Sequence, residues 1–426
     1  MDKLIIHGNK RISGDIEVQG SKNAALSLLM ASLVVKAKSY ISNVPDIGDV
    51  HNTLDVIKSI GCIVDYKNGL CKITCNKFNI ESLDIKAASR VRYSILLLGA
   101  LAGQIDKIRI PMPGGCVIGL RRLDIHLDIL RKMGATIKGT DEWIEVETSN
   151  LHGAEITLRY SSDTGTVNAI LAACNVSGKS VIDNASISPE TNQVCRFLNH
   201  AGMNITGIGT KKLTIWGKAT KGIEYSIIPD RLVALTYMIA ALITNGNIKI
   251  TNFHTIYLTN ELNALKDIGA EIRQIGDDIL VESSNKYNPC NISGSIYPEF
   301  HTDAVPLFVP LLLKANGNSV AKDLIFDNRF NYIDWLNSMG ANITKHDGDW
   351  NCPSGNIGQY IVIKPSPNMR GNNLAATDLR GGMAMLLSAL AIDGKTVIND
   401  ADIIYRGYEN IVENLNNLGA EIEVIH

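Results

Sequence analysis

The sequence predicts an α/β protein of two similar domains, each made of three βαβαββ-type repeats around buried helices, an inside-out α/β barrel, with a cleft between the domains. Three observations lead to this prediction. A short glycine motif recurs six times, each repeat contains an almost uniformly apolar helical stretch, and β-rich sequence follows each glycine. The 426 residues are enough for two domains with complete hydrophobic cores.

The repeated motif is an apolar residue, a glycine, and then a small or apolar residue before a β-rich stretch. Its copies are roughly 70 residues apart, a spacing typical of repeated supersecondary units. Each copy follows an amphipathic helical pattern, and glycine just past a helix favours the left-handed C-cap conformation. The six glycines are Gly61, Gly134, Gly202, Gly269, Gly340 and Gly419.

Each repeat also carries a helical stretch that is apolar on all sides and must therefore be buried. The six stretches are residues 23–35, 92–102, 166–176, 231–243, 303–314 and 380–392. Three such helices form the core of each domain in this interpretation. We expect residues 22–229 to form one domain, and residues 1–21 with 230–426 to form the other.

The starts of these helices combine Ser, Thr or Asp with Lys or Arg, as at Lys22, Arg92 and Arg380. Helix capping explains the Ser, Thr and Asp residues. Capping does not explain the cations, which are unfavourable beside the positive end of a helix dipole. An anion bound to the free N–H groups of a helix start would stabilise the nearby Lys and Arg side chains. The pattern therefore predicts an anion-binding site.

The composition argues against several classes of function. There are 41 Lys and Arg residues against 43 Asp and Glu, so charge does not favour nucleic acid or a membrane surface as partner. The apolar runs are too short to span a bilayer, and we expect no signal peptide. Eight cysteines without a CxxC pair are expected to be reduced thiols of a cytoplasmic protein. The spacing of His and Cys predicts no metal, and we expect no cofactor.

Four motifs, together with Asp303 and residues 326–330, carry a family resemblance. The motifs are Gly20-Ser21-Lys22-Asn23-Ala24-Ala25-Leu26; Pro113-Gly114-Gly115-Cys116-Val117-Ile118-Gly119 with Arg121, Asp124 and His126; Thr377-Asp378-Leu379-Arg380; and Arg406-Gly407-Tyr408-Glu409. In this order they resemble the UDP-N-acetylglucosamine enolpyruvyl transferases, from Lys3 to the end of the chain. The resemblance implies transfer of the enolpyruvyl group of phosphoenolpyruvate to the 3-hydroxyl of UDP-N-acetylglucosamine with release of phosphate, an early cytoplasmic step of peptidoglycan synthesis and the target of fosfomycin.

The resemblance also implies a site for the donor. Phosphoenolpyruvate carries a carboxylate and a phosphate, and Arg binds both groups through paired hydrogen bonds. The implied phosphoenolpyruvate-binding residues are Lys22, Arg92, Arg121, Arg329, Arg380 and Arg406. A surface ion pair is the alternative for each cation taken singly.

Four residues are implied in catalysis: Cys116 as general acid, Asp303 as the base that activates the acceptor hydroxyl, and Lys22 and Arg406. Cys116 lies among glycines, a sequence suited to an exposed loop, and Arg121 nearby would favour its thiolate. The alternatives are an inert core cysteine and, for Asp303, a helix cap.

The resemblance leaves the identity of the acceptor substrate open. The implied acceptor-binding residues are Asn23, Arg121, Asp124, Ser162, Asp303 and Ile325, with Asp230 and Asp378 in structural or hinge positions. The sequence departs from the family pattern at Arg122, 163–165, 232–235 and Tyr405. Two alternatives therefore remain: a related transferase acting on another nucleotide such as UMP, and a catalytically silent anion-binding scaffold. Oligomeric state and regulation are not predicted.

Overall fold

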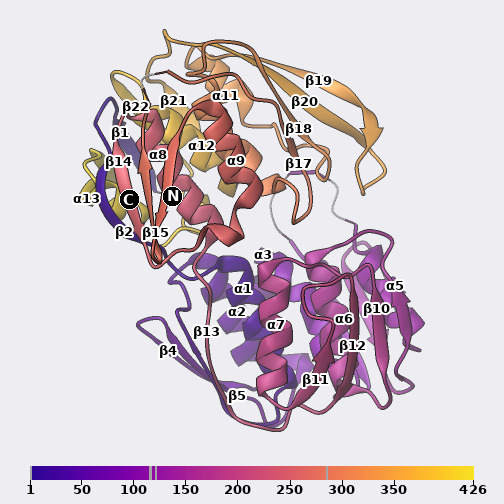
Figure 1. The fold of residues 1–426 in the computed structure, drawn as a ribbon. Helices are drawn as coiled ribbons and strands as arrows, with labels where there is room; N and C mark the ends of the chain where they lie inside the picture. Colours follow the sequence, from indigo (N-terminus) through magenta and orange to yellow (C-terminus); the bar gives the residue numbers. More distant parts are fainter. Residues whose placement is uncertain (1, 115–117, 120–121, 285) are drawn as a thin grey trace. The chain divides into compact units, whose positions relative to one another are not determined.

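The computed structural model describes residues 2–114, 118–119, 122–284 and 286–426. Within these limits the chain divides into two compact units. Unit 1 contains the residues up to Gln19, the pair Ile118–Gly119, and Pro229–His426. Unit 2 contains Gly20–Gly115 and Arg122–Ile228, apart from the undescribed position. Each unit is an α/β structure with its own core (Figure 1).

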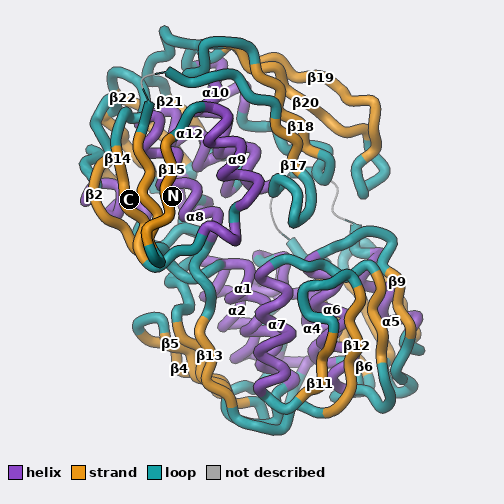
Figure 2. The backbone as a smooth tube through the Cα atoms, in the orientation of Figure 1, coloured by secondary structure: helices purple, strands orange, loops and turns teal. Residues whose placement is uncertain are grey.

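Three central helices fill the core of each unit, as the apolar stretches predicted. In unit 1 they are α8 (Arg231–Ile243), α10 (Val305–Leu312) and α12 (Leu379–Leu390), and every residue of the three is buried. In unit 2 they are α1 (Lys22–Ala31), α4 (Leu97–Leu101) with the preceding 3-10 turn η3 (Arg92–Leu96), and α6 (Asp163–Asn175). The strands lie towards the outside of each unit (Figure 2).

The strands of the described residues form three sheets in each unit. The first sheet of unit 1 has the strand order β21 (Asn373–Ala375), β22 (Lys395–Asn399), β1 (Lys3–His7) and β23 (Ile422–Ile425). The second has the order β15 (Glu271–Ile275), β16 (Asp278–Glu282), β14 (Asn247–Thr251) and β2 (Ser13–Glu17). The third has the order β17 (Ile292–Gly294), β18 (Ser319–Asp323), β20 (Ile357–Lys364) and β19 (Asn342–Asn351). The first sheet of unit 2 has the strand order β11 (Met203–Thr206), β12 (Lys212–Gly217), β10 (Ser180–Asp183) and β9 (Glu155–Thr157). The second has the order β13 (Ile223–Ser226), β3 (Ser39–Ser42), β5 (Leu70–Thr74) and β4 (Ile63–Lys67). The third has the order β6 (Lys107–Pro111), β8 (Trp143–Glu147) and β7 (Thr136–Gly139).

Each four-stranded sheet has the same topology: one parallel pair at an edge, followed by two antiparallel pairs. The sheet of β6, β8 and β7 has only the antiparallel pairs. β1 and β2 join sheets of unit 1, so the beginning of the chain completes repeats whose other strands come much later. The shared topology confirms the prediction of three similar repeats in each of two domains.

One outer helix accompanies each repeat. These helices are α2 (Gly48–Ser59), α5 (Asp124–Lys132) and α7 (Pro189–His200) in unit 2, and α9 (Thr259–Ile268), α11 (Ile333–Ser338) and α13 (Ile411–Asn417) in unit 1. The remaining short helices are η1 (Ser32–Val34), η2 (Ile80–Ser82), α3 (Ile85–Arg90), η4 (Thr255–Tyr257), η5 (Thr302–Ala304) and η6 (Ala401–Ile403). The six repeated glycines follow the outer helices with φ between 97° and 108°, which confirms the predicted left-handed turns.

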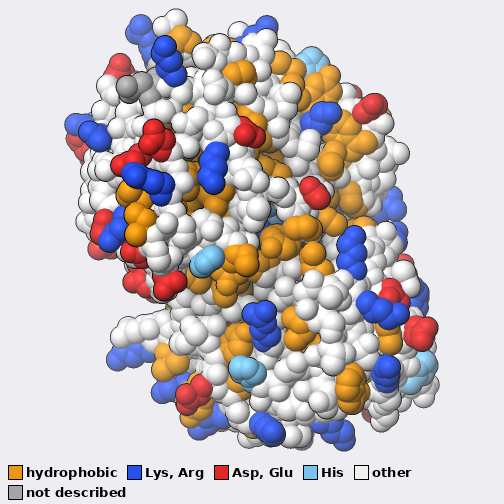
Figure 3. Space-filling model, viewed as in Figure 1, with side chains coloured by type: hydrophobic (Ala, Val, Ile, Leu, Met, Phe, Trp, Pro, Cys, Tyr) orange, Lys and Arg blue, Asp and Glu red, His pale blue; other side chains and the backbone are white. Residues whose placement is uncertain are grey.

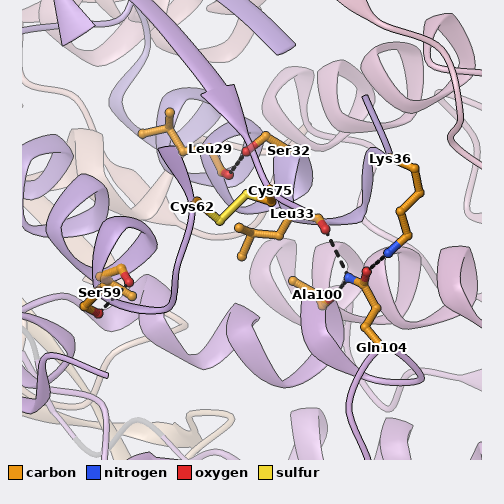
Figure 4. The surroundings of a disulfide bond; sticks show 10 residues. Leu29, Ser32, Leu33, Lys36, Ser59, Cys62, Cys75, Ala100 and Gln104 are labelled. Carbon is orange, nitrogen blue, oxygen red and sulfur yellow. Dashed lines mark hydrogen bonds between the residues drawn. A yellow bond between two sulfur atoms is a disulfide. The ribbon is translucent and has the colours of Figure 1, made fainter. Parts of the chain in front are cut away.

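The cysteine prediction was wrong for one pair, because Cys62 and Cys75 form a disulfide. β4 and β5 are paired in a hairpin whose last register pair is Ile63 with Thr74. The two cysteines stand one position beyond that pair, so they face each other at the open end of the hairpin. Leu29 and Leu33 belong to the apolar surroundings of the bond (Figure 4). A search for CxxC motifs misses this pairing, since the cysteines are 13 residues apart.

Basic and acidic side chains are interspersed on the face shown in Figure 3, in keeping with a formal net charge of −2. No helix in the described ranges is both long enough and apolar enough to cross a membrane.

Candidate active site

A cluster of charged side chains in unit 1 centres on Arg329, whose side chain is only 1% exposed. Its Nη2 donates to the Asp303 carboxylate at 2.6 Å, and its Nε donates to Asp323 at 3.2 Å. Thr302 also donates to the carboxylate of Asp323. A buried guanidinium needs such partners, since removing a charge from water is costly without compensating bonds. The cluster therefore fixes Asp303 in η5, the 3-10 turn directly before α10.

Asp303 lies between two arginines. Its second oxygen is 3.5 Å from Nε of Arg380, and its side chain is 24% exposed. Burial by itself would raise the pKa of Asp303, but Arg329 and Arg380 outweigh burial and hold this pKa well below its usual range. Asp323 is more deeply buried, and burial raises its pKa despite the nearby Arg329. Asp303 is therefore the strongly ionised carboxylate of the pair.

Arg380 is fixed by the start of α12 and by a tyrosine. Its backbone N–H and that of Gly381 each donate to the Asp378 carboxylate at 3.0 Å, so Asp378 caps the helix. Its Nη1 donates to the Tyr408 hydroxyl at 2.7 Å, and Tyr408 is 2.9 Å from the hydroxyl of Thr236. These bonds direct the Arg380 guanidinium towards Asp303.

Arg406 lies half-buried in the turn that follows η6. The Gln19 side chain forms two hydrogen bonds with this turn. Its Nε2 donates to the carbonyl of Gly407 at 3.2 Å, and its Oε1 accepts from the N–H of Glu409 at 2.7 Å. The carbonyl of Gln19 also accepts from the N–H of Asp230 at 2.8 Å. The Asp230 carboxylate caps α8, at the point where the chain enters unit 1 for the last time.

Two predicted donor ligands lie at helix starts in unit 2. Lys22, the first residue of α1, forms a 3.0 Å ion pair with the buried Asp49 of α2. Arg92, the first residue of η3, donates to the carbonyl of Pro113 at 3.2 Å, just before the predicted cysteine loop. Asn23 is half-buried beside Lys22.

The predicted acceptor residues Asp124 and Ser162 lie in another part of unit 2. Asp124 begins α5 and forms an ion pair with Arg159. Ser162 caps α6 by accepting from the N–H of Gly165 at 3.1 Å. A cavity of about 230 Å³ lies between α5 and β9 with the two residues that follow β9; its lining includes aliphatic side chains such as Ile129 together with Arg159.

The predicted site residues Cys116 and Arg121 lie outside the described residues. Ile325 belongs to the turn after β18, where its N–H donates to Asp323 at 2.8 Å. The structure therefore brings Asp303, Arg329 and Arg380 together in unit 1, while Lys22 and Arg92 are held by other partners in unit 2.

Sequence reasoning missed Asp323, Asp49 and Arg159 as partners of the site residues. Only Tyr408 had a usable signal, because it belongs to the Arg406–Glu409 motif. The other partners depend on tertiary contacts between distant elements. Among the described residues, no group of three or more His, Cys, Asp and Glu side chains is arranged to hold a metal ion.

Comparisons with known proteins agree along the whole chain. Residues 6–415 match the family model of EPSP synthase (3-phosphoshikimate 1-carboxyvinyltransferase). The UDP-N-acetylglucosamine 1-carboxyvinyltransferase of Halothermothrix orenii is 35% identical over 426 residues, covering 100% of both chains. The enzyme of that name from Pelagibacter ubique is 36% identical over 428 residues, again covering 100% of both.

Solved structures share the fold at lower sequence identity. The enolpyruvyl transferase NikO from Streptomyces tendae has a TM-score of 0.87 at 22% identity and covers 99% of this chain and 98% of its own. An EPSP synthase from Acinetobacter baumannii has a TM-score of 0.70 at 20% identity and covers 100% of both chains. The two-unit α/β fold is thus that of the enolpyruvyl transferases, a class of enzymes. Within this class, the chain belongs to the family of the UDP-N-acetylglucosamine 1-carboxyvinyltransferases.

Proposed function

We propose that this protein transfers the enolpyruvyl group of phosphoenolpyruvate to the 3-hydroxyl of UDP-N-acetylglucosamine and releases phosphate. Full-length relatives with that name support the acceptor. The observation that carries the mechanism is the Asp303 carboxylate at a helix start, paired with Arg329 and Arg380. An ionised carboxylate is the group needed to accept a hydroxyl proton.

The proposed donor ligands are the cations at the helix starts and motif turns. Arg380 and Arg406 in unit 1, with Lys22, Arg92 and Arg121, supply the charge to bind a phosphate and a carboxylate. Arg329 is buried and bonded to two carboxylates. We therefore give Arg329 the task of fixing Asp303, with donor binding as a lesser role.

The reaction is an addition followed by an elimination. The Cys116 thiol donates its proton to the methylene carbon of phosphoenolpyruvate, which leaves positive charge on the neighbouring carbon. The acceptor hydroxyl attacks that carbon and passes its proton to Asp303. The Cys116 thiolate then takes a proton back from the new methyl group, the double bond re-forms, and the bond between carbon and the phosphate oxygen breaks, so that phosphate leaves with that bond's electron pair.

The low pKa of Asp303 has a consequence for this step, because a strongly ion-paired carboxylate is a weak base. A donor phosphate or carboxylate that binds Arg380 would take up part of the charge now directed at Asp303. Asp303 would then become more basic when the donor is in place. This coupling would favour proton transfer only in the complex of both substrates.

On the acceptor side, the proposed binding residues are Asn23, Arg121, Asp124, Ser162, Asp303 and Ile325. Asp124 pairs with Arg159, which lines the cavity beside α5, and the aliphatic side chains and Arg159 of this cavity suit a base and an anionic group of a nucleotide. The product would enter peptidoglycan precursor synthesis, and we expect the reaction to take place in the cytoplasm.

A phosphate-release assay with an acceptor panel tests the function. Release is expected with phosphoenolpyruvate plus UDP-N-acetylglucosamine, and background rates with either substrate alone. Release with UMP or shikimate 3-phosphate instead would move the protein to another acceptor. Mass spectrometry after fosfomycin treatment tests the thiol: one adduct at Cys116 is expected, and Cys116→Ser should lose both the adduct and most turnover. An unmodified, inactive wild type would favour the silent scaffold.

A further inference from the structure

Tyr408 belongs to the Arg406–Glu409 motif, but the proposed mechanism gives it no role. The residue is 1% exposed and lies between η6 and α13. The backbone on each side of it is held by one side chain: the carbonyl of Gly407 accepts from Gln19 at 3.2 Å, and the N–H of Glu409 donates to Gln19 at 2.7 Å. A tyrosine buried on such a turn has a defined position, and its hydroxyl needs hydrogen-bond partners.

The Tyr408 hydroxyl has one partner on each of two central helices. It lies 2.7 Å from Nη1 of Arg380 in α12 and 2.9 Å from Oγ1 of Thr236 in α8. A guanidinium can only donate, so the tyrosine oxygen accepts from Arg380. Thr236 donates its single hydroxyl proton to the carbonyl of Leu232 at 2.8 Å. Tyr408 is therefore the donor to Thr236, and burial raises the pKa of Tyr408, so the hydroxyl keeps the proton that this bond needs.

The bond from Arg380 to Tyr408 differs from the other contact of the same guanidinium. Nε of Arg380 is buried and has no hydrogen-bond partner among the described residues. It lies 3.5 Å from Asp303, which is an ion-pair distance without hydrogen-bond geometry. Such a pair attracts the guanidinium but does not set its orientation. The 2.7 Å bond to Tyr408 does set it, because a hydrogen bond is directional.

We propose that Tyr408 is a positioning residue for the phosphoenolpyruvate site: its hydroxyl, held by Thr236, orients the guanidinium of Arg380 for the donor. This inference rests on the proposed function, in which Arg380 is a donor ligand. A guanidinium binds a phosphate or a carboxylate through two parallel bonds, so its orientation matters as well as its charge. Through this hydroxyl, α8 of one repeat determines the geometry of a ligand carried by α12 of another.

A second buried tyrosine provides the matched control. Tyr237 follows Thr236 in α8 and is also 1% exposed. Its hydroxyl accepts from Nδ2 of Asn414 in α13 at 3.0 Å, and Asn414 is not a proposed ligand. Tyr237→Phe and Tyr408→Phe each remove one hydrogen-bonded hydroxyl from the core of unit 1. Only Tyr408→Phe removes a hydroxyl bonded to Arg380, so the pair separates the orientation of Arg380 from the loss of a core hydrogen bond.

The experiment measures phosphoenolpyruvate binding by calorimetry, and the KM of each substrate in turnover with UDP-N-acetylglucosamine. A hydrogen bond to a charged group changes an equilibrium constant by roughly 10- to 100-fold. We expect Tyr408→Phe to weaken phosphoenolpyruvate binding by roughly 10-fold and to raise its KM, with little change in the KM of the nucleotide. Thr236→Val should show a smaller loss of the same kind, and Thr236→Ser, which keeps the hydroxyl, should resemble wild type. Tyr237→Phe should keep wild-type affinity for phosphoenolpyruvate.

The variant Tyr408→Phe/Thr236→Val tests the order of the bonds. If Thr236 acts through Tyr408, this double variant should bind phosphoenolpyruvate no more weakly than Tyr408→Phe. Multiplied losses, wild-type affinity in Tyr408→Phe, or an equal loss in Tyr237→Phe would overturn the inference. Should Tyr408→Phe fail to fold, the comparison of Thr236→Val with Thr236→Ser decides in the same way. A wild type that binds phosphoenolpyruvate without turning over UDP-N-acetylglucosamine would contradict the proposed acceptor alone, and the binding measurements would still decide on Tyr408; a wild type that binds no phosphoenolpyruvate would overturn both.

Discussion

Units 1 and 2 share a three-repeat architecture but hold their charged side chains in different ways. Unit 1 joins Asp303, Arg329 and Arg380 in one continuous cluster, with an arginine that is 1% exposed. Unit 2 holds its predicted ligands in separate pairs, such as Asp124 with Arg159, whose side chains are 32% and 47% exposed. The clustered charges are preorganised, whereas an exposed pair can exchange its partner at little cost. This contrast separates the fixed surroundings of Asp303 in unit 1 from the more adaptable pair of Asp124 and Arg159 in unit 2.

The largest expected effect comes from Arg329→Met. The change leaves Asp303 and Asp323 without their shared cation, and breaking a buried ion pair destabilises a protein by about 3–5 kcal/mol. Urea unfolding measures the loss. The control is Arg273→Met, whose pair with Glu282 is exposed and should contribute at most about 1 kcal/mol. Similar losses in both variants would remove the distinction between buried and exposed charges.

The disulfide of unit 2 should have the next largest effect. Closing a loop of this size contributes about 3 kcal/mol in the chain-entropy model. Reductant should therefore lower the unfolding free energy of wild type and leave that of Cys62→Ser/Cys75→Ser unchanged. Cys290→Ser, at a free half-buried cysteine, is the control and should respond to reductant as wild type does. An equal response of the double variant would show that this bond does not stabilise unit 2.

Asp303 should give unit 1 a pH-dependent stability. Its folded pKa is depressed, because Arg329 and Arg380 outweigh the effect of burial. The stabilisation is therefore present above the pKa of an unfolded aspartate, about 3.9, and is lost as the pH falls further. At pH 7, Asp303→Asn should lose about 1.5–3 kcal/mol. Urea unfolding between pH 7 and pH 3 should show this difference shrinking in the acid range; a constant difference would contradict the ion pairs.

The smallest stability effect is expected at Arg159. Arg159→Ala removes an exposed ion pair, so unfolding free energy should change by less than about 1 kcal/mol. The KM for the nucleotide should nevertheless change, because Arg159 lines the cavity and pairs with the predicted acceptor residue Asp124. Arg131→Ala is a useful comparison, since this residue also lines the cavity but pairs with Asp128 on the same helix. A KM unaffected by either variant would move the acceptor away from this cavity.

The sequence predicted the architecture because its signals are local. An all-apolar helix such as residues 231–243 has only one stable environment, and a glycine such as Gly269 marks a helix end by itself. The partners of the site residues were not predictable in this way. Asp323 looks like an ordinary acid at the end of a strand, and only the packed fold brings it to Arg329. The same holds for Cys62 and Cys75, whose spacing is meaningful only once β4 and β5 are paired.

The proposed mechanism depends most on the Asp303 carboxylate, which lies between Arg329 and Arg380 in unit 1. Phosphate release from phosphoenolpyruvate and UDP-N-acetylglucosamine, measured for wild type and Asp303→Asn, tests it directly. General-base catalysis contributes about 100- to 10,000-fold, so we expect the kcat of Asp303→Asn to be lower by at least about 100-fold while the variant still unfolds cooperatively. A folded Asp303→Asn enzyme with a kcat within a few-fold of wild type would contradict it.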